Sequence, residues 1–301
     1  MKTKPTFNRQ RLLMALLQAF GGKLSKLDLQ KLLFLFVQES GTKKKAYEFV
    51  PYHYGCYSFQ ANSDVKTMHN YGFLYLNEQD NTIELTNTQI DHIENLKEAD
   101  KNFLNTFAYK YKDLSGNKLI AHVYKNYPYY TMNSKIAHKF SIEPYKKQQT
   151  LFPEDAKDFY TIGYEGITFE NYLNKLIANG ISILCDVRKN PYSMKFGFSK
   201  NMLKHALEQI GIKYIHLPEL GIESEDRQEL NSFADYQKLF KEYQATTIQA
   251  EAAQKALQYI NDISKHTKIA LTCFEKDIEY CHRGVIAEEL HNKFQLEYNN
   301  I

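Results

Sequence analysis

The second half of the chain alternates short apolar runs with amphipathic segments, and this alternation limits the folds open to it. The clearest runs are ISIL at 181–184 and IALT at 269–272. Nearly continuous apolar runs of this length are typical of strands covered on both faces. Strands that alternate with helices favour a parallel sheet with right-handed crossovers. We therefore predict an α/β domain with an open, Rossmann-like parallel sheet over residues 158–301, although no dinucleotide-type glycine fingerprint is present.

The first half has a different pattern. Helical spacing of apolar residues is evident over 8–20 and 25–38, and a shorter helix is predicted within 63–74. The segment LYLNEQDNTIELT at 74–86 indicates a hairpin whose turn is NEQDN. Helices followed by a two-stranded wing are typical of a mainly α, winged-helix-like domain, which we predict over residues 1–140.

Between the two lies a segment without sustained periodicity, residues 141–157, which contains prolines and mixed charge and which we predict to be a linker. A chain of 301 residues is long enough for two such domains. Its formal net charge of +3 is too small to indicate nucleic-acid binding, although lysines cluster in GTKKKAY at 41–47.

The number of cysteines and the hydropathy of the chain indicate the cellular compartment. Four scattered cysteines in a chain of this size do not suggest a disulfide framework. No apolar run approaches the roughly 20 residues needed to cross a bilayer, and the N-terminus lacks a small-residue cleavage site. We therefore expect a cytoplasmic protein with reduced thiols and no membrane association.

Residues of catalytic and ligand-binding types directly follow every predicted strand. In chain order they are Tyr164, Glu165 and Gly166; Asp186 and Arg188; His216, Glu219 and Gly221; and Cys273, Glu275 and Lys276. Open parallel sheets bind ligands in the crevice outside the carboxyl ends of their strands. Loops are commonly polar for other reasons, but Arg, His, Glu and Cys recur here in place of Gly, Asn and Ser. We therefore predict one shared pocket along this edge.

The second and third loops offer residues that could bind an anion. Arg188 is a candidate anion ligand that Asp186 would orient; alternatively, the two form an ion pair at the strand end. Ser193 is a candidate phosphate contact, close to a predicted helix that starts after Ser199. It could equally be a turn residue.

Acid–base candidates occur in the same loops. His216 precedes the stiff turn PELG and is a candidate general base, or only a packed strand-end residue. Glu165, Glu219 and Glu275 are further candidate acids or bases. Arg227, within ESEDRQEL, either binds ligand or balances its acidic neighbours.

The stretch CFEKDIEYCHRGVIAEEL at 273–290 permits three interpretations. In the first, a helix N-terminus holds Cys281, His282 and Arg283 and favours anion binding. The same position lowers the pKa of a thiol, so Cys281 or Cys273 could be a nucleophile. Zinc is a less favoured cofactor, because three ligands need a fourth and seven residues between the cysteines exceed the spacing of a zinc knuckle. The cysteines could also be inert core residues. The cofactor is otherwise open.

Two resemblances to known families add to this. TIGYEG, DVRKNPYSMKFGFSKNML, GIKYIHLPELG and LTCFEKDIEYCHRGVIAEEL resemble, in order and spacing, the family of domain of unknown function 488 over about 158–295. LDLQKLLFLFVQES and FVPYHYGCYS are similar to Panacea-type antitoxin-associated domains, with Cys56 where proline is usual. The resemblances imply a sensor-plus-effector layout suited to a toxin–antitoxin or phage-defence role.

Two hypotheses of function follow. In the first, the α/β domain binds an anionic ligand, a nucleotide or a nucleic-acid end, with or without turnover, and the N-terminal domain recruits nucleic acid or a protein partner. The alternative is a non-catalytic DNA-binding regulator with a ligand-sensing α/β domain. Whether the protein is an enzyme stays open.

Overall fold

The computed structural model divides the chain into two compact units, Met1–Gln148 and Gln149–Ile301. The residues it describes are 4–41, 45–145, 158–223 and 230–301. The boundary between the units falls within the predicted linker, most of which lies outside the described residues. Among the described residues, no helix combines the length and the apolar character needed to cross a bilayer.

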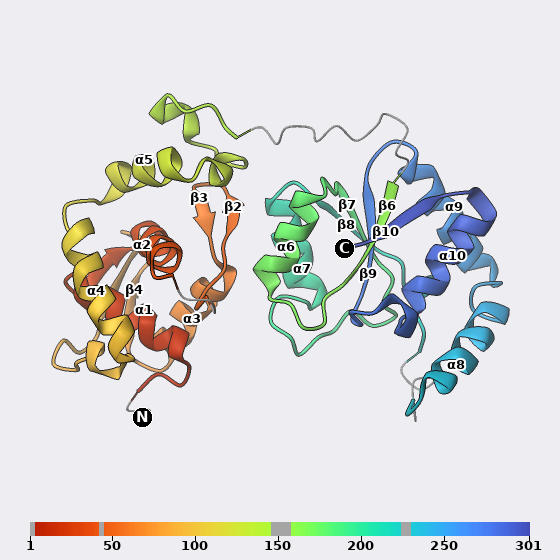
Figure 1. The fold of residues 1–301 in the computed structure, drawn as a ribbon, viewed down its shortest axis with the longest axis horizontal. Helices are drawn as coiled ribbons and strands as arrows, with labels where there is room; N and C mark the ends of the chain where they lie inside the picture. The colour runs from red at the N-terminus through yellow and green to blue at the C-terminus, as the bar shows by residue number, and fades with distance from the viewer. Residues whose placement is uncertain (1–3, 42–44, 146–157, 224–229) are drawn as a thin grey trace. The chain divides into compact units, whose positions relative to one another are not determined.

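The N-terminal unit is mainly helical and contains a small antiparallel sheet (Figure 1). Its α-helices are α1 (Asn8–Ala19), α2 (Lys26–Glu39), α3 (Phe59–Asn70), α4 (Glu98–Tyr111) and α5 (Gly116–Asn126). The sheet has the order β1-β5-β4, formed by β1 (Lys23–Ser25), β4 (Leu74–Asn77) and β5 (Thr82–Leu85). A second hairpin joins β2 (Val50–Tyr52) to β3 (Gly55–Tyr57). Three helices, α1 to α3, come before the β4–β5 wing, and this is the winged-helix-like order that the sequence predicted.

Local sequence explains how these helices begin and what they bury. The Ser25 hydroxyl accepts a hydrogen bond from the Asp28 backbone N–H at 2.9 Å, which caps α2. The apolar faces of α1 and α2 then pack into the core, where Leu13, Leu16 and Phe34 have no exposed surface.

The C-terminal unit contains a parallel five-stranded sheet with the order β10-β6-β9-β7-β8. Its strands are β6 (Asp158–Gly163), β7 (Ile183–Asp186), β8 (Lys213–His216), β9 (Ile269–Cys273) and β10 (Glu297–Asn300). Its α-helices are α6 (Phe169–Ala178), α7 (Lys200–Gln209), α8 (Phe233–Ala245), α9 (Glu251–Ser264) and α10 (His282–Phe294). Figure 1 shows α6 and α7 on one side of the sheet and α9 and α10 on the other. The predicted open α/β sheet is confirmed.

Two details differ from the sequence-based expectation. The fifth strand, β10, was not predicted, because EYNN is short and polar and forms a strand only by pairing alongside β6. From the sequence, one long helical region is expected over roughly 233–264, but the structure has two helices there, α8 and α9, separated by residues 246–250.

The carboxyl ends of four strands lie level at one edge of the sheet. Gly163 of β6 is paired with Cys273 of β9, and Asp186 of β7 is paired with both Thr272 and His216. A Cβ on Gly163 would lie 1.9 Å from the Glu275 carbonyl oxygen, so only glycine allows the β9 loop to approach β6 this closely. The loops that follow the strands are therefore brought together, as the sequence predicted.

Candidate functional site

Two cavities open near the carboxyl edge of the sheet. The first, here called the edge cavity, has a volume of about 300 Å³ and is lined by Tyr164, Arg188, Lys189, Asn190, Tyr192, Ser193, Met194, Ile222, Cys273 and Phe274. The second, here called the α8 cavity, has a volume of about 260 Å³ and is lined by Ile222, Leu230, Tyr236, Leu239, Phe240, Glu275, Tyr280 and His282. Loops after β6, β7 and β9 contribute to them, so residues from both ends of the unit's sequence meet here.

Asp186 and Arg188 form a buried, bidentate ion pair. Arg188 donates from Nε to Asp186 Oδ1 at 2.8 Å and from Nη2 to Oδ2 at 2.6 Å. Its Nη1 donates to the Tyr164 hydroxyl and to the Phe198 carbonyl, and the Tyr214 hydroxyl donates to Asp186 at 2.6 Å. Burial acts to lower the pKa of Arg188, but its hydrogen bonds with Asp186 outweigh this and raise that pKa. The guanidinium thus lines the edge cavity with its charge already compensated by Asp186.

Three of the residues that line the edge cavity are exposed apolar or aromatic side chains. Tyr192 is 71% exposed, Met194 is 91% exposed and Phe274 is 42% exposed. Lys189 lies beside them and makes an exposed ion pair with Glu223 at 2.7 Å. The Ser193 hydroxyl, a predicted phosphate contact, accepts a hydrogen bond from the Lys195 backbone N–H at 3.2 Å. The cavity therefore combines a basic wall with a rim of exposed aromatic and thioether groups.

The predicted general base is differently placed. His216 Nε2 lies 2.9 Å from the Arg188 carbonyl oxygen, and Nδ1 lies 3.1 Å from Lys200 Nζ. Because a carbonyl only accepts and an ammonium only donates, Nε2 carries the proton and Nδ1 accepts. Both ring nitrogens are engaged, and His216 is not among the residues that line the two cavities. The imidazole thus braces the backbone at Arg188, and its role as a general base stays a prediction.

Other predicted acids, bases and ligands are dispersed. Glu165 is exposed and accepts a hydrogen bond from the Lys276 backbone N–H at 3.0 Å. Glu219 is exposed on a short 3₁₀ helix, Pro218–Leu220, and neither glutamate is among the residues lining the two cavities. Glu275 does line the α8 cavity. Arg227 lies outside the described residues.

The two cysteines and the histidine of CFEKDIEYCHR converge. Cys273, Cys281 and His282 each offer a ligand atom, and these atoms lie within 4.8 Å of one another. His282 Nδ1 is 3.7 Å from Cys273 Sγ and 4.0 Å from Cys281 Sγ. Cys273 Sγ also donates to Glu275 Oε2 at 3.2 Å. These three side chains are almost fully buried.

The expected activation of Cys281 by the helix N-terminus is not found. Burial raises the pKa of the Cys281 thiol well above its ordinary value, and the neighbouring Cys273 raises it further. A thiol that is 1% exposed loses the hydration that stabilises a thiolate, and this outweighs the dipole of α10. The predicted lowering of the thiol pKa is therefore wrong for the protein without a bound ion.

The Arg283 side chain is bound by other groups of the same unit. Its guanidinium is fully buried and donates to the carbonyl oxygens of Glu275 and Lys276 and to Asn300 Oδ1 on β10. It is not among the residues that line the two cavities. Arg283 thus ties the loop after β9 to the edge strand, and its predicted place at an anion site is untested.

Sequence reasoning missed several residues of the site. Five residues lie within the four DUF488-like motifs but were not predicted to belong to the site: Lys189, Tyr192, Met194, Tyr214 and Phe274. The available signal was two large apolar side chains in the polar stretch RKNPYSMK.

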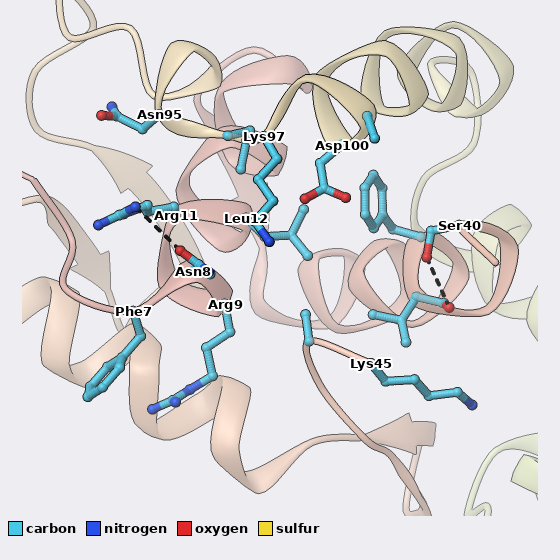
Figure 2. A pocket seen from close by; sticks show the side chains of 15 residues that line it. Phe7, Asn8, Arg9, Arg11, Leu12, Ser40, Lys45, Asn95, Lys97 and Asp100 are labelled. Carbon is cyan, nitrogen blue, oxygen red and sulfur yellow. Dashed lines mark hydrogen bonds between the residues drawn. The ribbon is translucent and has the colours of Figure 1, made fainter. Parts of the chain in front are cut away.

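The N-terminal unit has a larger cavity of its own, about 850 Å³, at the starts of α1 and α4 and the end of α2. Figure 2 shows Arg9, Arg11, Lys45 and Lys97 around it, with Asp100 as an acidic neighbour. Arg9 is paired with the buried Asp64 at 2.7 Å. The rest of the predicted lysine cluster, residues 42–44, lies outside the described residues.

Comparison with known proteins identifies part of the chain. No curated protein and no solved structure matches it. Residues 168–290 match the family model described as Domain of unknown function DUF488. The match runs from the start of α6 to within α10 and includes the loops that follow β7, β8 and β9. The C-terminal unit therefore contains a domain of the DUF488 family.

Proposed function

We propose that the C-terminal unit binds an anionic ligand with a planar base, a nucleotide or the end of a nucleic acid, in the edge cavity. The observation that carries this proposal is the pairing of a basic wall with an exposed aromatic rim in one cavity at the carboxyl edge of a parallel sheet. Ligands of open α/β domains bind at this edge.

The rim supplies contacts for a base. Tyr192 and Phe274 are exposed aromatic side chains, and Met194 is an exposed, polarisable thioether. A base stacked on an aromatic side chain gains about 1–3 kcal/mol, largely irrespective of its identity. Exposed apolar groups grouped around a polar cavity typically mark a binding surface.

The wall supplies contacts for the anion. Arg188 is compensated by Asp186, so the charge that attracts an anion comes chiefly from Lys189. Its ion pair with Glu223 is exposed on both sides, and pairs of that kind contribute only about 0–1 kcal/mol. A phosphate can therefore displace Glu223 at small cost.

Binding of a 5′-phosphorylated single-stranded oligonucleotide and of nucleoside phosphates tests the proposal by fluorescence anisotropy and calorimetry. We expect Tyr192→Ala to weaken binding about tenfold, as loss of one stacked base implies, and Lys189→Ala to weaken it and reduce its salt dependence. The matched controls are Tyr259→Ala and Lys255→Ala on α9. Tyr259 is 40% exposed, and neither residue lines the cavity. Equal affinity in the cavity variants and the controls would refute the proposal.

The alternative, a DNA-binding regulator, is favoured by the basic side chains around the N-terminal cavity. It is disfavoured by the elements that a winged-helix-like unit would present to DNA. Helix α3 carries a single lysine or arginine, Lys66, and the β4–β5 turn contains Glu78 and Asp80.

Duplex DNA binding by the full chain separates the two functions. The regulator requires an affinity that falls steeply with salt and that drops when Arg11, Lys45 and Lys97 are replaced by alanine together. If wild-type protein binds single-stranded 5′-phosphate ends but not duplex DNA at low salt, the regulator hypothesis fails and the edge-cavity proposal stands.

A further inference from the structure

We propose that Cys273, Cys281 and His282 bind a divalent transition-metal ion, and that their ligand chemistry favours zinc. The site lies between the edge cavity, which Cys273 lines, and the α8 cavity, which His282 lines. It does not depend on the proposed nucleotide ligand, and the experiment below separates the two.

The spacing of the ligand atoms fits a tetrahedral ion. Zinc lies about 2.3 Å from a thiolate sulfur and about 2.0–2.1 Å from an imidazole nitrogen. In a tetrahedron these lengths place a sulfur and a nitrogen roughly 3.5 Å apart. The two sulfur-to-Nδ1 distances are 3.7 and 4.0 Å, and all three ligand atoms lie within 4.8 Å of one another, so movements of about 1 Å or less would bring them to tetrahedral spacing.

The histidine is oriented as a ligand. His282 Nε2 lies 3.0 Å from the Val187 carbonyl oxygen, which can only accept, so Nε2 carries a proton. In the neutral ring the lone pair is then on Nδ1, the atom that faces both sulfurs. A hydrogen bond from the second ring nitrogen to a backbone carbonyl is typical of metal-bound histidines.

The fold also overcomes the long separation of the cysteines in sequence. Cys273 ends β9 and Cys281 is the residue directly before α10, and the chain between them includes a 3₁₀ helix, Ile278–Tyr280. Arg283 holds this loop by its bonds to the Glu275 and Lys276 carbonyls. The ligands are thus positioned by a strand end, a helix start and a braced loop.

The charge and the number of the three ligands both suit a zinc ion. Two thiolates and a neutral imidazole compensate a divalent cation, and a buried group needs that compensation. Thiolate ligands select zinc over magnesium or calcium. Three protein ligands leave one position open, as in catalytic zinc sites, and Glu275 Oε2 lies only 3.2 Å from Cys273 Sγ. Glu275 also lines the α8 cavity, from which a water or ligand could reach the ion.

The full chain, purified without chelator, tests this by native mass spectrometry and elemental analysis. We expect one zinc ion per chain after equilibration with Zn²⁺ and a higher Tm than for the chelator-stripped protein. Replacement by Co²⁺ should produce the visible absorption of a tetrahedral site together with a thiolate-to-cobalt charge-transfer band. Cys281→Ser and Cys273→Ser should each weaken zinc binding at least tenfold. Cys185→Ser, at another buried cysteine of the same unit, should keep one ion.

Several outcomes would overturn the proposal. These are wild-type protein without stoichiometric metal, a Cys273–Cys281 disulfide found by peptide mapping, or unchanged zinc affinity in both ligand variants. Because a ligand variant could fail to fold, the cobalt spectrum of the wild-type chain decides independently of it. Tyr192→Ala should lose nucleotide affinity and keep its zinc, so the failure of one proposal is distinguishable from the failure of the other.

Discussion

Replacing Tyr214 with phenylalanine isolates one bond of the Asp186–Arg188 network. The Tyr214 hydroxyl donates to Asp186 Oδ2 at 2.6 Å in a buried setting. The substitution removes only the donor, while both hydrogen bonds from the Arg188 guanidinium to Asp186 remain. A hydrogen bond to a charged group contributes about 1.5–3 kcal/mol, and we expect Tyr214→Phe to reduce the free energy of unfolding by that amount.

The same unit offers a matched comparison. The Tyr172 hydroxyl is also buried and donates to the neutral Thr272 hydroxyl at 2.9 Å. A bond between neutral groups contributes about 0.5–1.5 kcal/mol, so Tyr172→Phe should cost roughly half as much as Tyr214→Phe. The two changes delete the same atom from the same residue type, which removes differences in volume from the comparison.

Urea denaturation followed by circular dichroism measures both. The slope of unfolding free energy against urea should be the same in the two variants, because each deletes one oxygen. In an Asp186→Asn background, the cost of Tyr214→Phe should fall to that of a neutral bond. Equal costs for the two phenylalanine variants, or a larger cost for Tyr172→Phe, would refute the reasoning that the Asp186 charge strengthens this network.

Two further predictions concern the strand ends and the N-terminal unit. Gly163→Ala would place a Cβ 1.9 Å from the Glu275 carbonyl oxygen. It should therefore lower Tm by several degrees and reduce zinc affinity in a calorimetric titration. Gly211→Ala is the control for zinc affinity, because its backbone would be strained but open space surrounds the added methyl group. Burial and the neighbouring Glu39 raise the pKa of Tyr111 to about 12. The unfolded chain therefore loses this proton first as pH rises, and stability should fall between pH 10 and 12. Denaturation at several pH values should show a smaller fall in Tyr111→Phe, and an identical profile would contradict the assignment.

Much of the architecture could be predicted because it depends on local pattern. The run IALT became most of β9, the run ISIL includes the first two residues of β7, and the helical spacing over 25–38 became α2. The placement of functional residue types after each strand also followed from sequence, since parallel strands end at one edge. Four motifs were enough to indicate the DUF488 family.

Other features depend on which segments become neighbours. EYNN forms strand β10 only beside β6, and Arg283 is held at the carbonyls of the preceding loop only once that loop has folded back. The helix dipole at Cys281 suggested a reactive thiolate, whereas desolvation, which depends on the packed surroundings, acts in the opposite direction.

The sequence by itself determined that residues of catalytic and ligand-binding types would follow the strands at one edge of a parallel sheet, because alternation and periodicity are local properties. Only the tertiary structure decided the strand order, in which β9, the fourth strand along the unit, is inserted between β6 and β7. That insertion places Cys273 between the loops of Tyr164 and Arg188 and beside His282. Strand order follows from packing between segments distant in sequence, and so no spacing of residues could reveal it.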